Sequence, residues 1–359
     1  MVAHAGHLHA EHPLAVDLSL SDEQEQLVEA FGTFFVKECP PAVVRASEET
    51  DGFDAGLWEA FGALGGPTMG ADPAVGGGGA SLLDLELVAE RCGAVLAPIP
   101  LVDGLVTARL LAVGGPSTRP TFDRLRDAQP PVATLALRPA TDGLARLVPA
   151  GAVATIVVGL DDDDLVAAEA DGVPVGSVHN LGDGPVADRS LRSAARTVVA
   201  TGTRAHELHE GAVDEWRVLT AGALVGLAGA ALELGVDYAK QRHQFGVPIG
   251  SFQALAHGLA DAATAVDGAR LLAREAAWAA DEDEPDSTAL ARMAFLFAAR
   301  SAQQATAVAL HVHGGYGFTL EYDIQLYHRR AKAWPLLLGD PRRGALHLAD
   351  ALFGPVEGH

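Results

Sequence analysis

The hydrophobic pattern of the chain changes character twice between its ends. Over roughly the first 115 residues, apolar side chains such as Leu27, Phe31 and Phe35 recur at the spacing of an amphipathic helix. Short apolar runs bounded by turn-forming segments follow, as in a small sheet. From about Ala212 onward the pattern is helical again, and its segments are long. Because strand-like and helix-like segments do not alternate, the pattern argues against a doubly wound sheet and predicts a multidomain α+β fold.

These three regions indicate three domains, which follow a short N-terminal leader. We expect a flexible leader at residues 1–16, an N-terminal helical domain at 17–118, a small middle β domain at 119–210 and a C-terminal helical bundle at 211–359. The bundle is expected because its helical segments are long and rich in small residues, which allow helices to pack closely.

The local signals predict individual elements within these domains. Ser21 is a plausible N-cap for the first helix, with acidic residues in the first turn. The further helices are expected at residues 57–64, 81–92, 101–113, 214–242, 252–281, 288–313 and 337–352. The strands are expected at residues 132–137, 154–160, 165–168 and 196–200.

The charge balance and the cysteine count exclude several classes of protein. The formal net charge is -22, whereas a nucleic-acid partner requires a basic surface, so we expect none. Two cysteines, Cys39 and Cys92, indicate neither a disulfide framework nor a cysteine-based metal site. No spacing fixes a metal geometry among the histidines of the leader, and we expect no metal there. These histidines are His4, His7, His9 and His12.

One segment, Leu219 to Val236, is apolar enough to consider as a membrane span. It contains Glu233 and is rich in glycine and alanine, which is typical of a buried bundle helix. The segment Met1 to Val16 lacks the basic region and the apolar stretch of a signal peptide. We therefore expect a cytoplasmic protein without a membrane partner.

A first cluster of chemically useful residues joins two of the long helices. Gly246 and Pro248 predict a tight turn between them. Arg242 offers a planar fork of donors that suits a phosphate group. Gln253 offers an amide beside the free N–H groups of a helix start, and Phe245 is suited to pack on a heterocycle. Alone, this segment is equally compatible with a plain corner between helices.

A second cluster follows the last long helix, in the run from His311 to Tyr322. Gly314, Gly315 and Gly317 allow the backbone to approach a ligand closely. A glycine-rich run alone is also typical of a helix C-cap. A basic group follows in this acidic chain: Arg329, Arg330 and Lys332.

Together the two clusters resemble the acyl-CoA dehydrogenase family. The form Arg-x-x-Phe-Gly-x-x-Ile-Gly-x-Phe-Gln, at Arg242 to Gln253, and the form Gly-Gly-x-Gly-Phe-x-x-Glu, at Gly314 to Glu321, are specific in combination. The stretch Leu57 to Pro98 looks like the opening helical domain of that family, and the order of domains extends the resemblance over nearly the whole chain. The resemblance implies an FAD-dependent oxidoreductase that desaturates an acyl-CoA thioester, with electron-transfer flavoprotein as the acceptor.

In that family, FAD lies across a subunit interface. The resemblance implies that one set of residues holds the pyrophosphate and adenine half of a flavin seated mainly in a neighbouring subunit. His311 stands where the family usually has glutamine, and it retains a hydrogen-bond donor. The residues so implied are Arg242, Gln244, Phe245, Gln253, His311, Gly314 and Gly315.

The positions of the family's catalytic base carry other residues here. The reaction needs a carboxylate that removes the proton alpha to the thioester. The commoner glutamate position, in a form like Arg-Asp-Ala-Lys-(x)5-Glu-Gly-Thr, falls on Leu338 when Lys332 and Gly339 set the register. The other position, in a form like Asp-x-Glu-Arg, falls on Trp216. Neither side chain accepts a proton, so the resemblance implies no catalytic residue in this chain.

The middle domain also departs from the family. Its flavin-ring strand usually carries a Thr-Glu-Pro-Gly-type run, whereas the nearest match here is Leu137 to Ala140, without the acidic residue. The same chain thus keeps the motif that serves a neighbour's flavin and loses the features of its own active site.

Three hypotheses follow from this combination. The first is a base-lacking subunit of a heterotetramer, with two copies of each chain, whose homologous catalytic partner holds the acyl-CoA; bulky and steroid side-chain acyl-CoAs are the expected substrates by resemblance. The second is a self-sufficient homotetramer with a displaced base, either Glu215 or Asp340. The third is a binding or scaffold subunit without chemistry.

Overall fold

The structure, a computed structural model, describes residues 16–127, 129–169, 176–193 and 195–354. Residues 1–15 of the predicted leader, with its four histidines, lie outside the described residues. The predicted three-part α+β architecture is confirmed: helices, then a small β region, then a helical bundle. The domain boundaries at 118/119 and 210/211 stay predictions, and one helix runs across the second of them.

The N-terminal helices begin where local capping allows them to begin. Ser21 caps α1 through a capping box with Gln24, and Ser81 caps α4 in the same way with Asp84. The helices are α1 (Asp22–Glu38), α2 (Pro41–Ser47), α3 (Ala55–Ala63), α4 (Leu82–Ala94), α5 (Leu101–Val113) and α6 (Arg119–Arg124). Short 3-10 turns lie at Gly66–Thr68, Pro73–Val75 and Gly115–Ser117.

The middle region is a four-stranded sheet in the order β1-β3-β4-β6, beside a two-stranded ladder of β2 and β5. β1 pairs with β3 in parallel, and the other pairs are antiparallel. The strands are β1 (Ala133–Leu135), β2 (Leu144–Val148), β3 (Ile156–Asp161), β4 (Asp164–Glu169), β5 (Ala187–Ser190) and β6 (Arg196–Thr201). The four predicted strands correspond to β1, β3, β4 and β6, whereas β2 and β5 were not predicted.

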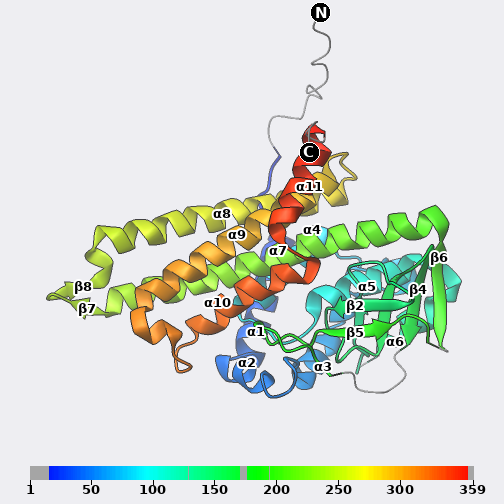
Figure 1. Ribbon diagram of the computed structural model, residues 1–359, viewed down its shortest axis with the longest axis horizontal. Helices are drawn as coiled ribbons and strands as arrows, with labels where there is room; N and C mark the ends of the chain where they lie inside the picture. Colours follow the sequence, from blue (N-terminus) through cyan, green and yellow to red (C-terminus); the bar gives the residue numbers. More distant parts are fainter. Residues whose placement is uncertain (1–15, 128, 170–175, 194, 355–359) are drawn as a thin grey trace, which may run out of the picture.

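The C-terminal bundle is built on one long helix. α7 (Gly202–Gln241) packs against α4 on one side and against α8 (Gln253–Asp281) and α9 (Ser287–His313) on the other. In Figure 1 these three helices extend well beyond the body of the molecule. The chain then forms α10 (Ile324–Ala333), a 3-10 turn at Trp334–Leu338, and α11 (Pro341–Phe353).

Two helix starts differ from prediction for physical reasons. α7 begins at Gly202 rather than at residue 214, because its first turns pack on the sheet through Ala205 and His209, whose Nε2 lies 2.8 Å from the carbonyl oxygen of Ala136. α11 begins at Pro341 rather than at 337, because Gly339 has φ +113° and Asp340 and Pro341 form a capped start. α10 was not predicted as a helix.

The segment considered as a membrane span lies inside α7. By length and composition α7 qualifies as a possible span, and 72% of its most apolar window is buried inside the protein. Leu219, Leu224 and Leu227 are fully buried there, which agrees with the predicted bundle helix.

Close contact between α4 and α7 requires glycine. A Cβ atom on Gly226 would lie 1.9 Å from the carbonyl oxygen of Glu90, and one on Gly93 would lie 2.0 Å from that of Ala223. Gly229, one turn further along α7, has its nearest neighbour at 3.6 Å. The helix backbones therefore touch at Gly226 but not at Gly229.

We predict that Gly226→Ala lowers the free energy of unfolding by about 1–3 kcal/mol, because the helices must separate to admit the methyl group. Gly229→Ala is the matched control. It should leave the free energy of unfolding unchanged or raise it by up to about 1 kcal/mol, because alanine has the higher helix propensity. Denaturant unfolding of both variants tests this, and equal effects would contradict the close contact.

Candidate functional site

The first motif forms a tight β-hairpin at the end of α7. β7 (His243–Gln244) pairs with β8 (Val247–Pro248), so that Phe245 and Gly246 form the loop with φ of 53° and 83°. Two positive φ values match the loop type that follows the natural twist of a hairpin. A 3-10 turn at Ile249–Ser251 then leads into α8. The predicted tight turn is confirmed.

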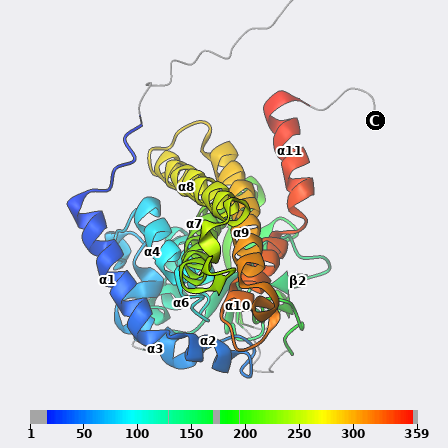
Figure 2. The ribbon, with the colours of Figure 1, turned by 90° about the vertical axis from the view of Figure 1, so that its left-hand side faces the viewer.

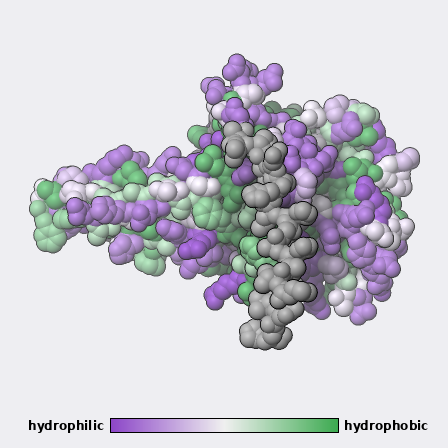
Figure 3. All heavy atoms as spheres, turned by 90° about the horizontal axis from the view of Figure 1, so that it is seen from above, coloured by the Kyte–Doolittle hydropathy of each residue, from purple (hydrophilic) through white to green (hydrophobic). Residues whose placement is uncertain are grey.

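The side chains of this hairpin face solvent. Phe245 is 93% exposed and meets the ring of Phe252 edge-on, with centroids 6.2 Å apart. Arg242, Gln244 and Gln253 are exposed as well. Within the described part of the chain, Arg242 makes no ion pair. In Figure 3 this narrow end of the molecule carries apolar surface at its tip.

The second motif lies at the end of α9. Gly314 caps the helix with φ +61° and ψ -139°, a conformation that favours glycine. A Cβ atom on Gly314 or Gly315 would meet nothing within 4 Å, so the backbone there borders open space. His311, on the last turn of α9, is exposed.

Aromatic contacts join the two motifs. The guanidinium carbon of Arg242 lies 5.9 Å from the ring centroid of Tyr316, in the glycine run. Tyr238, on α7, stacks on His313, on α9, at 4.3 Å. All seven residues that the sequence assigned to the flavin contact therefore lie at one end of the bundle, which Figure 2 views end-on.

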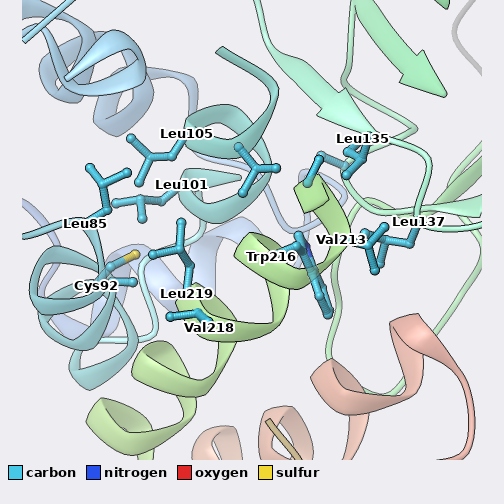
Figure 4. Close-up of a cluster of buried hydrophobic side chains, with 14 of the residues drawn as sticks. Leu85, Cys92, Leu101, Leu105, Leu135, Leu137, Val213, Trp216, Val218 and Leu219 are labelled. Carbon is cyan, nitrogen blue, oxygen red and sulfur yellow. The ribbon is translucent and has the colours of Figure 1, made fainter. Parts of the chain in front are cut away.

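Trp216 fills the interior near the middle of α7. It is 2% exposed, donates its indole N–H to Asp103 over 3.0 Å, and packs on Phe295 with centroids 5.8 Å apart. Figure 4 shows it among buried side chains that include Val213 and Leu219. It lines a mainly apolar cavity of about 150 Å³, together with Leu337 and Trp334.

Leu338 lies on a different cavity. That cavity measures about 400 Å³ and lies between α7, α9 and α11, with Phe295 in its wall. Because Trp216 and Phe295 are in contact and line different cavities, their two rings stand between the two spaces. The two positions where the family places its base thus open on separate cavities.

Both displaced-base candidates form structural contacts. Glu215 forms a two-point ion pair with Arg109, with nitrogen–oxygen distances of 2.9 and 3.1 Å, and it lines a third cavity that does not include Trp216. Asp340 lines the same cavity as Leu338, where it accepts the backbone N–H of Arg342 at 3.0 Å and thereby caps α11. Each carboxylate has a structural partner.

One contact was not visible in the sequence. Arg138, in the run where the family carries its flavin-ring strand, donates to the carbonyl oxygen of Leu337 over 2.6 Å. This hydrogen bond ties the middle region directly to the 3-10 turn that contains Leu338. The sequence offered only the missing acidic residue as a signal, because partners 199 residues apart are fixed by tertiary packing.

Asp103 is the second residue that sequence analysis missed. Burial raises its pKa to about 6, although the hydrogen bond from Trp216 lowers it. A carboxyl group that is partly protonated near neutral pH beside a cavity is a feature of functional sites. Here it holds the indole of Trp216 in place.

Comparison with known proteins decides the family. Residues 21–120 match the model of the acyl-CoA dehydrogenase N-terminal domain, and residues 207–350 match that of the C-terminal domain. Over 337 residues the chain is 32% identical to the acyl-CoA dehydrogenase IpdE2 of Mycolicibacterium smegmatis, covering 93% of this chain and 100% of the relative. This chain belongs to the acyl-CoA dehydrogenase family.

Other similar proteins agree with this assignment. IpdE2 of Mycobacterium tuberculosis is 29% identical over 89% of this chain and 94% of its own length. The ChsE4-ChsE5 complex from Mycobacterium tuberculosis shares the fold, with a TM-score of 0.84 at 24% identity over 95% of this chain and 100% of that one. A variant of the Tcur3481-Tcur3483 steroid ACAD shares the fold as well. Its TM-score is 0.81 at 24% identity, over 92% of this chain and 98% of that one.

Membership of the family makes the chain a flavoprotein oxidoreductase, with FAD as the cofactor. FAD supplies the redox chemistry of desaturation when it is bound. In enzymes of this family the protein holds the flavin and the thioester and provides the base.

We predict that Asp103→Asn stabilises the protein above pH 6. The folded state favours protonated Asp103, with a pKa of about 6, whereas an unfolded carboxyl group has a pKa of about 4. This group therefore contributes stability at low pH that is lost as pH rises from about 4 to 6. Asparagine keeps the acceptor for Trp216 and removes the buried charge. The free energy of unfolding should therefore rise by about 1–3 kcal/mol at pH 7.

Unfolding measured from pH 4 to pH 8 tests this, with the exposed Asp237→Asn as control. Asp103→Asn should make the free energy of unfolding less dependent on pH between pH 4 and 6, whereas the control should leave this dependence unchanged. Identical slopes for the parent and Asp103→Asn would contradict the pKa shift.

Proposed function

We propose that this chain is the base-lacking subunit of a heteromeric acyl-CoA dehydrogenase and completes the FAD site of a catalytic partner subunit. One observation carries the proposal: the flavin-contact end and the chain's own cleft lie far apart on one rigid helix. Trp216 and Arg242 are separated along α7 by roughly 40 Å, at a rise of 1.5 Å per residue. That separation exceeds the length of an extended FAD molecule, so the exposed end is suited to a flavin in another chain.

The residues at the exposed end fit the anionic half of FAD. Arg242 is exposed and makes no ion pair within the described residues. The start of α8 carries no side-chain cap, which leaves the N–H groups of Gln253 and Ala254 for an acceptor. The open space at Gly314 and Gly315 lets a phosphate or adenine approach the backbone. Arg242, Gln244, Phe245, Gln253 and this backbone would hold the group.

The chain's own cleft does not fit the flavin ring. In the family the ring lies beside the strand that corresponds here to Leu137 and Arg138. Arg138 instead spans directly to the carbonyl oxygen of Leu337, and the rings of Trp216 and Phe295 divide the space further inside. The cavity beside Trp216, of about 150 Å³, is small for an acyl chain, since ligand pockets usually measure about 300–1,000 Å³.

The missing base supports the same conclusion. Abstraction of the alpha proton requires a carboxylate within hydrogen-bond reach of the substrate. Trp216 and Leu338 cannot serve, Glu215 is held by Arg109 in another cavity, and Asp340 caps a helix. These contacts favour a partner that supplies the glutamate over a self-sufficient homotetramer.

The similar proteins support the kind of assembly and substrate. Two of the structural neighbours are named as pairs of chains, ChsE4-ChsE5 and Tcur3481-Tcur3483, and the second is named a steroid ACAD. We propose a cytoplasmic heterotetramer with two copies of each chain that desaturates a bulky, steroid-type acyl-CoA. Electron-transfer flavoprotein would accept its electrons.

Arg242→Ala tests this role from across the interface. In the complex with the catalytic partner, we predict that this change weakens the affinity for FAD at least tenfold. The reason is the loss of a charge-assisted contact to the pyrophosphate, while the partner's sequence stays unchanged. Arg204→Ala, at the other end of the same helix, is the control. FAD titration of the apo-complex measures both, and unchanged affinity in Arg242→Ala would contradict the proposal.

Asp340→Asn tests the self-sufficient alternative. The amide oxygen can still cap α11, so the fold should persist. We predict a kcat of the complex within about twofold of the parent, because the base lies in the partner. A hundredfold loss, the usual effect of removing a general base, would instead place the base in this chain.

A further inference from the structure

We infer that Tyr316 is a positioning residue for Arg242, which holds the guanidinium ready for the flavin pyrophosphate of the neighbouring subunit. This inference rests on the proposed function. It assigns a role to the one side chain inside the run Gly314 to Gly317 that is not glycine.

Among the described residues, the guanidinium of Arg242 has no recorded hydrogen bond or ion pair, and Tyr316 provides its cation–π contact. Its ring lies 5.9 Å from the guanidinium carbon, within the range of a cation–π interaction. The backbone of Arg242 is fixed at the end of α7, because its N–H donates to Tyr238 and its carbonyl oxygen accepts from Ile249. Within the described residues no carboxylate competes for this guanidinium.

The ring of Tyr316 is itself held by a series of aromatic contacts. It packs against Tyr322 at 5.5 Å, Tyr322 lies edge-on to His313 at 5.8 Å, and His313 stacks on Tyr238 at 4.3 Å. His313 is also fixed by a contact of 2.8 Å between its Nδ1 and the carbonyl oxygen of Ala309. The series therefore ties Tyr316 to the buried faces of α7 and α9.

The segment around Tyr322 is anchored from the N-terminal region. Arg45, on α2, donates to the carbonyl oxygen of Leu320 and to the carboxylate of Asp323, the latter at 2.6 Å. The loop that follows the glycine run is thus attached at both ends. Half of the surface of Tyr316 stays exposed, which leaves its ring accessible to Arg242.

The two uses of the guanidinium draw on different properties. A cation–π contact uses its positive charge over the face of the tyrosine ring, whereas binding of phosphate uses its N–H donors. Tyr316 can therefore restrict Arg242 without consuming its donors. An exposed arginine otherwise loses much side-chain entropy on binding, and prior restriction lowers this loss.

The test is a double-mutant cycle on FAD affinity in the full complex, measured by flavin fluorescence during titration of the apo-form. Tyr316→Leu should weaken FAD binding by about two- to fivefold, the effect of one exposed cation–π contact. Tyr316→Phe keeps the ring and should retain the affinity of the parent. In the Arg242→Ala background, Tyr316→Leu should have no further effect.

The outcomes distinguish this inference from the proposed function. If Arg242→Ala weakens binding but Tyr316→Leu does not, only the inference about Tyr316 fails. It also fails if the losses from Tyr316→Leu are equal in the two backgrounds, or if Tyr316→Phe is as damaging as Tyr316→Leu. If Arg242→Ala itself has no effect, the proposed function fails.

Discussion

The close packing of α7 against α4 and α9 is the constraint on which the rest of the structure depends. Gly226 and Gly93 let the backbones of α4 and α7 touch, and small residues such as Ala231 and Ala309 are fully buried where α7 meets α9. A helix held over this length is a rigid rod. It fixes Trp216 in the interior and Arg242 at the exposed end, and it sets the distance between them.

That fixed distance separates the interior position from the exposed motif. At the interior position, side chains of the chain itself occupy the space: Trp216 packs on Phe295 and bonds to Asp103, while Arg138 bridges to Leu337. At the exposed position, the donors and the open glycine backbone are kept.

Much of this organisation could be predicted from the sequence because it depends on local signals. The cap at Ser21, the bounds of α5, and the turn at Gly246 follow from short-range chemistry, and the structure confirms them. The start of α7 could not be predicted, since it depends on the packing of Ala205 and His209 on the sheet. The bridge from Arg138 and the partnership of Asp103 with Trp216 also depend on contacts between distant parts of the chain. The flavin-contact role of the seven motif residues stays a prediction.

The most direct test of the account is the FAD content per chain of the complex purified with its catalytic partner. The account predicts about one FAD for every two chains, and a colourless, inactive protein when this chain is purified alone. One FAD per chain in the complex, or a yellow and active homomer, would show that the cleft around Trp216 and Arg138 still holds a flavin, and would contradict the division of roles proposed for the two ends of α7.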